Sequence, residues 1–202
     1  GGFFGSELKA AGWDAVFVCG IGSTPQYLMI ADDRIELKDA AHLWGKDTVE
    51  TESTIQTDAG DKKIRIACIG PASEKLSLIS GIVNDAGRVA ARSGVGAVMG
   101  SKNLKAVSAR GTMDIQIAHP VEALEYNKSF ISQITSAKVS QTQGTLGTPF
   151  IWGATNSWGG VRTRNFQYNQ CEYADDIEPE RIDEICEETM GPYHMTGCYG
   201  CQ

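Results

Sequence analysis

The sequence predicts an α+β protein in which a part of mixed strands and helices is followed by a mainly α-helical part. Up to about residue 112, short runs rich in β-branched and aromatic residues alternate with turn residues and with at least one capped helix. From His119-Pro120 onward, apolar residues instead recur with the period of a helix. We therefore predict two domains, residues 1–113 and 114–202.

Helices and strands are both expected in the first domain. Phe4, Leu8 and Ala11 recur at helical spacing, and Gly12 suits a helix end. Asp47 followed by Glu50 is a capping-box pattern, which predicts a helix after Asp47. Strands are expected over residues 14–20 (DAVFVCG), the two arms of 25–37 around an Asp32-Asp33 turn, 62–70 (KKIRIACIG), 74–83 (EKLSLISGIV) and 103–111 (NLKAVSARG).

The second domain is expected to open with an amphipathic helix over residues 120–138, with Pro120 in its first turn. Residues 140–170 mix Gly, Trp and Asn, which predicts a loop that either packs or faces a ligand. The acidic stretch 172–188 predicts a solvated helix face, and a docking surface for a basic partner is the less favoured interpretation.

Composition excludes several classes of protein. The net charge is −7. The first 113 residues carry 13 basic and 13 acidic side chains, and the remainder carries 5 basic and 12 acidic ones. This acidic balance argues against a nucleic-acid binder. No run approaches 18 apolar residues, so no membrane span is predicted. Six cysteines are too few for a disulfide scaffold. Cys19 and Cys68 are expected to be small buried hydrophobes, and Cys171 and Cys186 free thiols without function.

The window from Arg88 to Arg110 is basic and rich in glycine. It contains no carboxylate, and Gly94, Gly96 and Gly100 lie among its cations. Glycines let a backbone approach a ligand, and guanidinium groups bind phosphate through paired hydrogen bonds. The window therefore predicts an anion site for a phosphorylated ligand, and the alternative is a solvated basic edge. The glycine spacing is too long for a dinucleotide fingerprint, and a P-loop motif is absent from the sequence. The cations are Arg88, Arg92, Lys102, Lys105 and Arg110.

Cys198 and Cys201 form a CxxC pair close to the last residue of the sequence. Such a pair ligates zinc, ligates an iron–sulfur cluster or acts as a redox dithiol. His194 would fit a zinc site, whereas the surrounding sequence lacks the βαβ context of a thioredoxin-like dithiol. Spacing alone leaves zinc and iron–sulfur equally open, and both require further ligands.

Several blocks of the sequence resemble the tungsten-containing aldehyde ferredoxin oxidoreductase family. They are GGFFGSELKAAGWDAV, DAAHLWGKDTVETE, IGPASEKLSL and above all RSGVGAVMGSKNLKAV, followed by NFQ at 165–167 and CYGC at 198–201. Members of this family are longer at both ends. The resemblance implies that residues 1–113 are the latter part of the N-terminal domain on which a bis-pterin tungsten cofactor rests. Residues 114–202 would then begin a helical second domain and end inside an iron–sulfur motif.

The resemblance also implies roles for individual residues. Gly1 matches a glycine of a pterin-contacting stretch, and Arg88 matches an arginine that contacts the cofactor. Val89, where the family often has Ala, would offer its backbone carbonyl to a magnesium ion bridging the pterin phosphates. Arg92 would play a supporting role. Cys198 and Cys201 match the first two cysteines of a CxxCxxxC run that binds a [4Fe–4S] cluster, and the third cysteine would fall three residues past Gln202.

The function implied by the resemblance is oxidation of an aldehyde to a carboxylic acid with electron transfer to ferredoxin or a similar acceptor. The cofactors would be tungstopterin, magnesium and the [4Fe–4S] cluster, and molybdenum is the alternative to tungsten. The protein would be cytoplasmic, and a homodimer is left open. No nucleic acid, membrane or catalytic residue is expected in this part of the chain, and residues 1–202 alone are expected to be inactive. The alternatives are reduction of aromatic acyl thioesters, a non-catalytic zinc or dithiol module, and a structural domain of an electron-transfer assembly.

Overall fold

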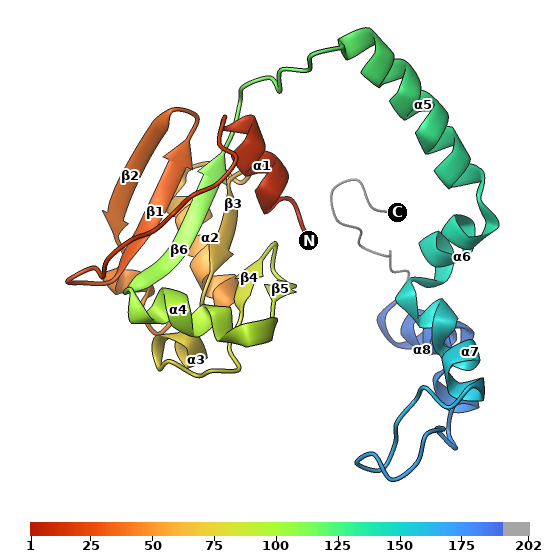
Figure 1. The fold of residues 1–202 in the computed structure, drawn as a ribbon. Coiled ribbons are helices and arrows are strands. Elements are labelled where there is room, and N and C mark those ends of the chain that lie inside the picture. Colours follow the sequence, from red (N-terminus) through yellow and green to blue (C-terminus); the bar gives the residue numbers. More distant parts are fainter. Residues whose placement is uncertain (192–202) are drawn as a thin grey trace. The chain divides into compact units, whose positions relative to one another are not determined.

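A computed structural model describes residues 1–191, and it divides the chain into two compact units, Gly1–Gln116 and Ile117–Gln202. The first unit is built on a mixed sheet with helices, and the described part of the second is helical (Figure 1). The predicted α+β class is therefore confirmed. The division lies close to the predicted boundary between residues 113 and 114.

The first unit contains a six-stranded sheet in the order β2-β1-β6-β3-β4-β5. Strand β1 runs parallel to β6, and every other neighbouring pair is antiparallel. The strands are β1 Gln26–Ala31, β2 Arg34–Asp39, β3 Arg65–Cys68, β4 Ile82–Asn84, β5 Arg88–Ala90 and β6 Leu104–Arg110. The helices are α1 Phe4–Ala10, α2 Thr48–Ala59, α3 Pro71–Glu74 and α4 Val95–Ser101, with short 3-10 turns η1 Ala41–Leu43 and η2 Arg92–Gly94.

Local signals in the sequence explain the start and end of α2. The Asp47 side chain accepts a hydrogen bond from the Glu50 backbone N–H (2.8 Å), and the Glu50 carboxylate accepts one from the Asp47 N–H (3.3 Å). This is the predicted capping box, which satisfies two backbone donors that a helix start otherwise leaves without partners. At the other end, Gly60 adopts the left-handed conformation that commonly terminates helices.

Two hydrophobic clusters lie on opposite faces of the sheet. Successive strand residues point to opposite faces, and in β1 Tyr27 belongs to one cluster while Leu28 and Ile30 belong to the other. Ile55 brings α2 into the first cluster, and Met99 brings α4 into the second. The sheet is thus covered by α2 on one side and by α4, together with the end of α1, on the other (Figure 1).

Two predicted strands are wrong or largely wrong. Residues 14–20 form no strand, because β2 already occupies the free edge of β1 through the turn at Asp32, and Phe17 is left 91% exposed. Within 74–83, Pro71 starts the helical turn α3, and only Ile82 and Val83 join a strand. In both cases an apolar, β-branched run has strand propensity but no place in the sheet.

The two cysteines expected to be buried differ sharply. Cys68 is fully buried in β3, as predicted, whereas Cys19 is exposed, which corrects the prediction for that residue. Burial away from water raises the pKa of the Cys68 thiol to about 12.

We expect iodoacetamide at pH 8 to alkylate Cys19 and to leave Cys68 unmodified, because the thiolate is the reacting species. Peptide mass spectrometry would check this, with labelling in denaturant as the control, and rapid native labelling of Cys68 would contradict it.

The second unit is helical over most of its described length. The predicted helix 120–138 is confirmed, with its end at Ser136. The predicted loop 140–170 is wrong in its first half, because α6 and α7 lie there. The sequence contains only one glycine between Lys138 and Leu146, and a helix tolerates one glycine at a cost of ~1 kcal/mol. The helices are α5 Pro120–Ser136, α6 Lys138–Leu146, α7 Trp152–Ser157 and α8 Pro179–Met190, with 3-10 turns η3 Thr148–Ile151 and η4 Asp175–Ile177.

Helix α8 overlaps the second half of the acidic stretch 172–188. It carries most of the acidic side chains of that stretch on an exposed surface, as expected of a solvated helix face. Among the described residues, none of the helices combines the length and the apolar character needed to cross a membrane.

Candidate functional site

The β4–β5 hairpin carries two of the predicted site residues and has an unusual turn. Asn84 and Arg88 face each other across the hairpin, and the Gly87 N–H donates to the Asn84 carbonyl (3.2 Å). Asp85 and Ala86 both have positive φ angles, of 46° and 57°. For Ala86 this left-handed conformation costs roughly 1–2 kcal/mol. The turn is held at its tip by Glu52 of α2, whose carboxylate accepts from the Ala86 N–H (2.9 Å).

The N-terminal segment, residues 1–3, lies against this hairpin. The Phe3 N–H donates to Asp85 Oδ2 (2.5 Å). With the Asn84 amide assigned so that its nitrogen faces the segment, this nitrogen lies 3.3 Å from the Gly1 carbonyl oxygen. Gly2 has a φ of 81°, and a Cβ built there would overlap the Asp85 carboxylate. Only glycine therefore allows the segment to approach the hairpin this closely.

Asp85 also joins the hairpin to the sheet. Its Oδ1 accepts from Arg65 Nη1 of β3 (3.3 Å), and the Arg65 guanidinium lies over the Phe3 ring, 4.9 Å from its centre. One carboxylate thus connects three parts of the unit: the N-terminal segment, the hairpin and the central part of the sheet.

The structure brings together some of the predicted site residues. Gly1 and Arg88 lie on the two segments that pack together here: the Asn84 side chain is next to the Gly1 carbonyl, and the Arg88 Cγ lies 3.2 Å from a Cβ built on the adjacent Gly2. Val89 follows in β5, one of the two edge strands of the sheet, and is 51% exposed. Arg92 opens η2 two residues after the strand ends, is exposed, and makes no ion pair with any residue in the described range.

Three cations of the basic window bond to groups of the same unit, which corrects the prediction that the window as a whole binds an anion. Lys105 is fully buried, and its Nζ lies 2.6 Å from Glu74 Oε1. Arg110 pairs with Asp61 (2.7 Å) and Glu7 (2.9 Å). The remaining cation, Lys102, donates to the Gly20 carbonyl oxygen (3.1 Å).

The glycines of the window also serve internal packing. A Cβ at Gly94 would overlap the Leu78 carbonyl oxygen, and one at Gly96 would overlap the Ser73 hydroxyl. At Gly100 the overlap would be with the Ser73 carbonyl oxygen, because α4 crosses α3 at close range. These glycines therefore explain the packing of α4, and the interpretation that they open the backbone to a ligand loses its support.

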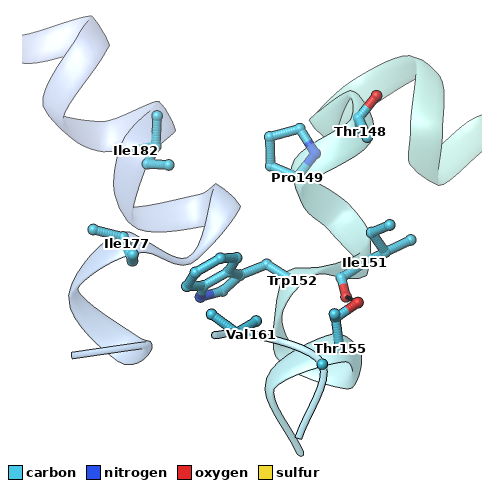
Figure 2. Close-up of a pocket in the computed structure, with 9 residues that line it drawn as sticks. Thr148, Pro149, Ile151, Trp152, Thr155, Val161, Ile177 and Ile182 are labelled. Carbon is cyan, nitrogen blue, oxygen red and sulfur yellow. Dashed lines mark hydrogen bonds between the residues drawn. The ribbon is translucent and has the colours of Figure 1, made fainter. Parts of the chain in front are cut away.

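The second unit contains an apolar groove, shown in Figure 2. Trp152 of α7 lies at its centre with its indole N–H donating to the Ala174 carbonyl (3.1 Å), and Ile177 and Ile182 face it from the other side. The groove has a volume of about 750 Å³, and none of the lining residues in the described part of the chain is ionisable. These residues therefore supply no acid or base for catalysis. The remaining lining residues are Thr148, Pro149, Ile151, Thr155, Gly160 and Val161.

The predicted metal ligands Cys198 and Cys201 lie outside the described residues. Within residues 1–191, the structure contains no group of three or more His, Cys, Asp or Glu side chains placed to hold a metal ion. The iron–sulfur prediction thus rests on the CxxC spacing and on the resemblance.

Comparison with known proteins identifies the family. The profile of the N-terminal domain of aldehyde ferredoxin oxidoreductase matches residues 1–111, more than half of the chain. The chain belongs to the aldehyde ferredoxin oxidoreductase family. This is a family of oxidoreductases, and its model covers both the N-terminal segment and the β4–β5 hairpin.

Individual members of the family extend the match into the second unit. The tungsten-containing aldehyde ferredoxin oxidoreductase of Thermococcus kodakarensis is 44% identical over 177 residues, which is 86% of this chain and 29% of that protein. The protein of the same name from Pyrococcus furiosus is 42% identical over the same shares. The WOR-like subunit of an aliphatic sulfonate oxidoreductase, also from Pyrococcus furiosus, is 29% identical over 83% of this chain and 29% of that protein.

A solved structure of a family relative has the same fold. A chain of the active-site complex of benzoyl-coenzyme A reductase, determined with 1,5-dienoyl-CoA, superposes with a TM-score of 0.69 and 32% identity, over 100% of this chain and 32% of that one. The chain therefore spans less than a third of the length of the relatives it matches.

Proposed function

We propose that the full-length aldehyde ferredoxin oxidoreductase family protein oxidises an aldehyde and water to a carboxylic acid. The reaction releases two protons and two electrons, and ferredoxin or a similar acceptor would take up the electrons. Cys198 and Cys201, with later cysteines, would hold a [4Fe–4S] cluster that supplies electron transfer. The names of the relatives that are 41–44% identical support a tungsten cofactor. The packing of the N-terminal segment, through Gly2, against the Arg88 stem is the structural observation that carries the proposal.

The groups at the hairpin fit a phosphorylated pterin. Arg88 and Arg92 are guanidinium groups suited to phosphate, in a segment without carboxylates. Val89 lies in a strand that forms one edge of the described sheet, where outward-facing backbone groups have no neighbouring strand. The proposal assigns its carbonyl to a magnesium ion, which takes oxygen ligands. Gly1 would let the pterin approach the backbone. When bound, the tungsten would supply the two-electron chemistry, and these residues of the chain would bind and orient the cofactor.

Replacing Arg88 with alanine should lower the tungsten content of the full-length protein. A hydrogen bond to a charged group contributes about 1.5–3 kcal/mol, so we expect roughly a tenfold or larger loss of tungsten per chain when tungstate is limiting. Elemental analysis of protein purified without oxygen would measure it. The matched control is Arg34→Ala, since Arg34 lies on β2 at the opposite edge of the same sheet and pairs with Glu36. Equal tungsten content in both variants would reject this role for Arg88.

The likeness to benzoyl-coenzyme A reductase favours a second candidate, the reduction of an aromatic acyl thioester. Assays of the full-length protein with aldehydes and an oxidised dye, and with benzoyl-CoA and a reduced dye, separate the two reactions. The same preparation tests the non-catalytic alternative. Tungsten with about four irons per chain, as one [4Fe–4S] cluster requires, supports the oxidoreductase, whereas zinc alone supports a zinc or dithiol module.

A further inference from the structure

We propose that Asp85 is a positioning residue of the cofactor site, and that its carboxylate fixes the N-terminal segment against the hairpin that carries Arg88. The proposal rests on the proposed function, because it concerns the placement of Gly1 and Arg88 toward the same cofactor. Neither charge patterning nor motif spacing singles out this residue.

The first argument is the use of both carboxylate oxygens. Oδ2 accepts from the Phe3 N–H at 2.5 Å, and Oδ1 accepts from Arg65 Nη1 at 3.3 Å. The Asp85 side chain is only 10% exposed, so these bonds form with little competition from water. The first bond joins residues separated by 82 positions in the sequence. Asp85 therefore sets the distance between two segments that are otherwise remote along the chain.

The second argument is the contact that this distance creates for Arg88. Gly2 has no side chain, and the Arg88 Cγ lies 3.2 Å from the position where a Cβ would stand. The Arg88 stem therefore packs against the backbone of the N-terminal segment. If the segment moves away from Asp85, the Arg88 stem loses this surface, and the guanidinium loses one of the groups that define its direction.

The third argument is the strain in the turn. Asp85 and Ala86 both adopt left-handed backbone angles, and a sterically costly conformation of this kind persists only where its surroundings hold it. The holding contacts are the Asp85 carboxylate and the Glu52 carboxylate at the Ala86 N–H. A turn held from both sides keeps Arg88 at a fixed place at the edge of the sheet.

The experiment compares tungsten content with thermal unfolding in the full-length protein. The variants are Asp85→Ala, which removes both bonds, and Asp85→Glu, which keeps the charge but lengthens the side chain by one methylene. The control is Asp61→Ala, which breaks another ion pair of the same unit, with Arg110 (2.7 Å). We expect the tungsten content per chain to fall about fivefold or more in both Asp85 variants. In Asp61→Ala we expect a lower unfolding temperature without a comparable fall in tungsten content.

The outcomes separate this proposal from the proposed function. If Asp85→Ala does not accumulate as folded protein, the tungsten content of Asp85→Glu tests the positioning role. A normal tungsten content in Asp85→Glu would overturn the positioning role. The same holds if the tungsten content of every variant falls only in proportion to its loss of unfolding temperature. If Arg88→Ala lowers the tungsten content and the Asp85 variants do not, the cofactor site stands without Asp85. If Arg88→Ala also has no effect, the proposed site itself fails.

Discussion

Replacing Glu74 with alanine is expected to lower the free energy of unfolding of the unit formed by residues 1–116 by about 3–5 kcal/mol. Lys105 is fully buried in β6, and its Nζ lies 2.6 Å from Glu74 Oε1 and 2.8 Å from the Lys46 carbonyl oxygen. Without Glu74 the ammonium group keeps one carbonyl but loses its counter-charge away from water. The Glu74 carboxylate also accepts from the Gly45 N–H at 2.9 Å, so the loop before α2 loses a contact.

Denaturant unfolding would measure this effect, and two controls make it specific. The double variant Glu74→Met with Lys105→Met removes both charges, and it should recover most of the stability because methionine fits irregular buried space. The variant Asp14→Ala breaks the exposed pair of Asp14 with Lys9, and we expect a change within about 1 kcal/mol. A Glu74→Ala protein as stable as Asp14→Ala would contradict the importance of the buried pair.

The part of the fold that could be predicted depends on neighbouring residues. The capping box at Asp47 and Glu50 and the turn at Asp32 each involve residues a few positions apart, so the sequence contains the whole signal. The strand predicted at residues 14–20 fails for a different reason. Its propensity is real, but β1 is already paired with β2 on one side and β6 on the other. Whether a β-prone run joins a sheet depends on which edges are free, and that is a property of the whole unit.

The candidate site shows the same limit. Arg88 and Arg92 stood out because the segment around them lacks acids, and that signal is local. The carboxylates that neutralise the cations at the end of the window, Glu74 for Lys105 and Asp61 for Arg110, lie outside it in the sequence. A charge count within one window therefore overestimated the anion site. Asp85 and Gly2 were missed because their roles arise only when distant segments meet.

Replacing Gly100 with alanine should destabilise the first unit by about 3 kcal/mol, the upper part of the range for overpacking. Gly100 lies inside α4, where the change would normally stabilise a helix by roughly 1 kcal/mol. Here the added methyl would overlap the Ser73 carbonyl oxygen, and backbone atoms at a helix contact cannot rotate away as a flexible side chain can. The steric cost therefore exceeds the gain in helix propensity.

The matched control is Gly5→Ala in α1, where a Cβ meets no atom within 4 Å, and it should be neutral or stabilise the unit by up to ~1 kcal/mol. Denaturant unfolding compares the free energies of unfolding of the two variants, and elemental analysis of the full-length proteins compares their tungsten contents. If the window glycines serve packing, Gly100→Ala loses stability in the absence of any cofactor. If they instead open the backbone to a ligand, Gly100→Ala keeps the stability of the parent and loses only tungsten. The close contact between α4 and α3 leads us to expect the first result.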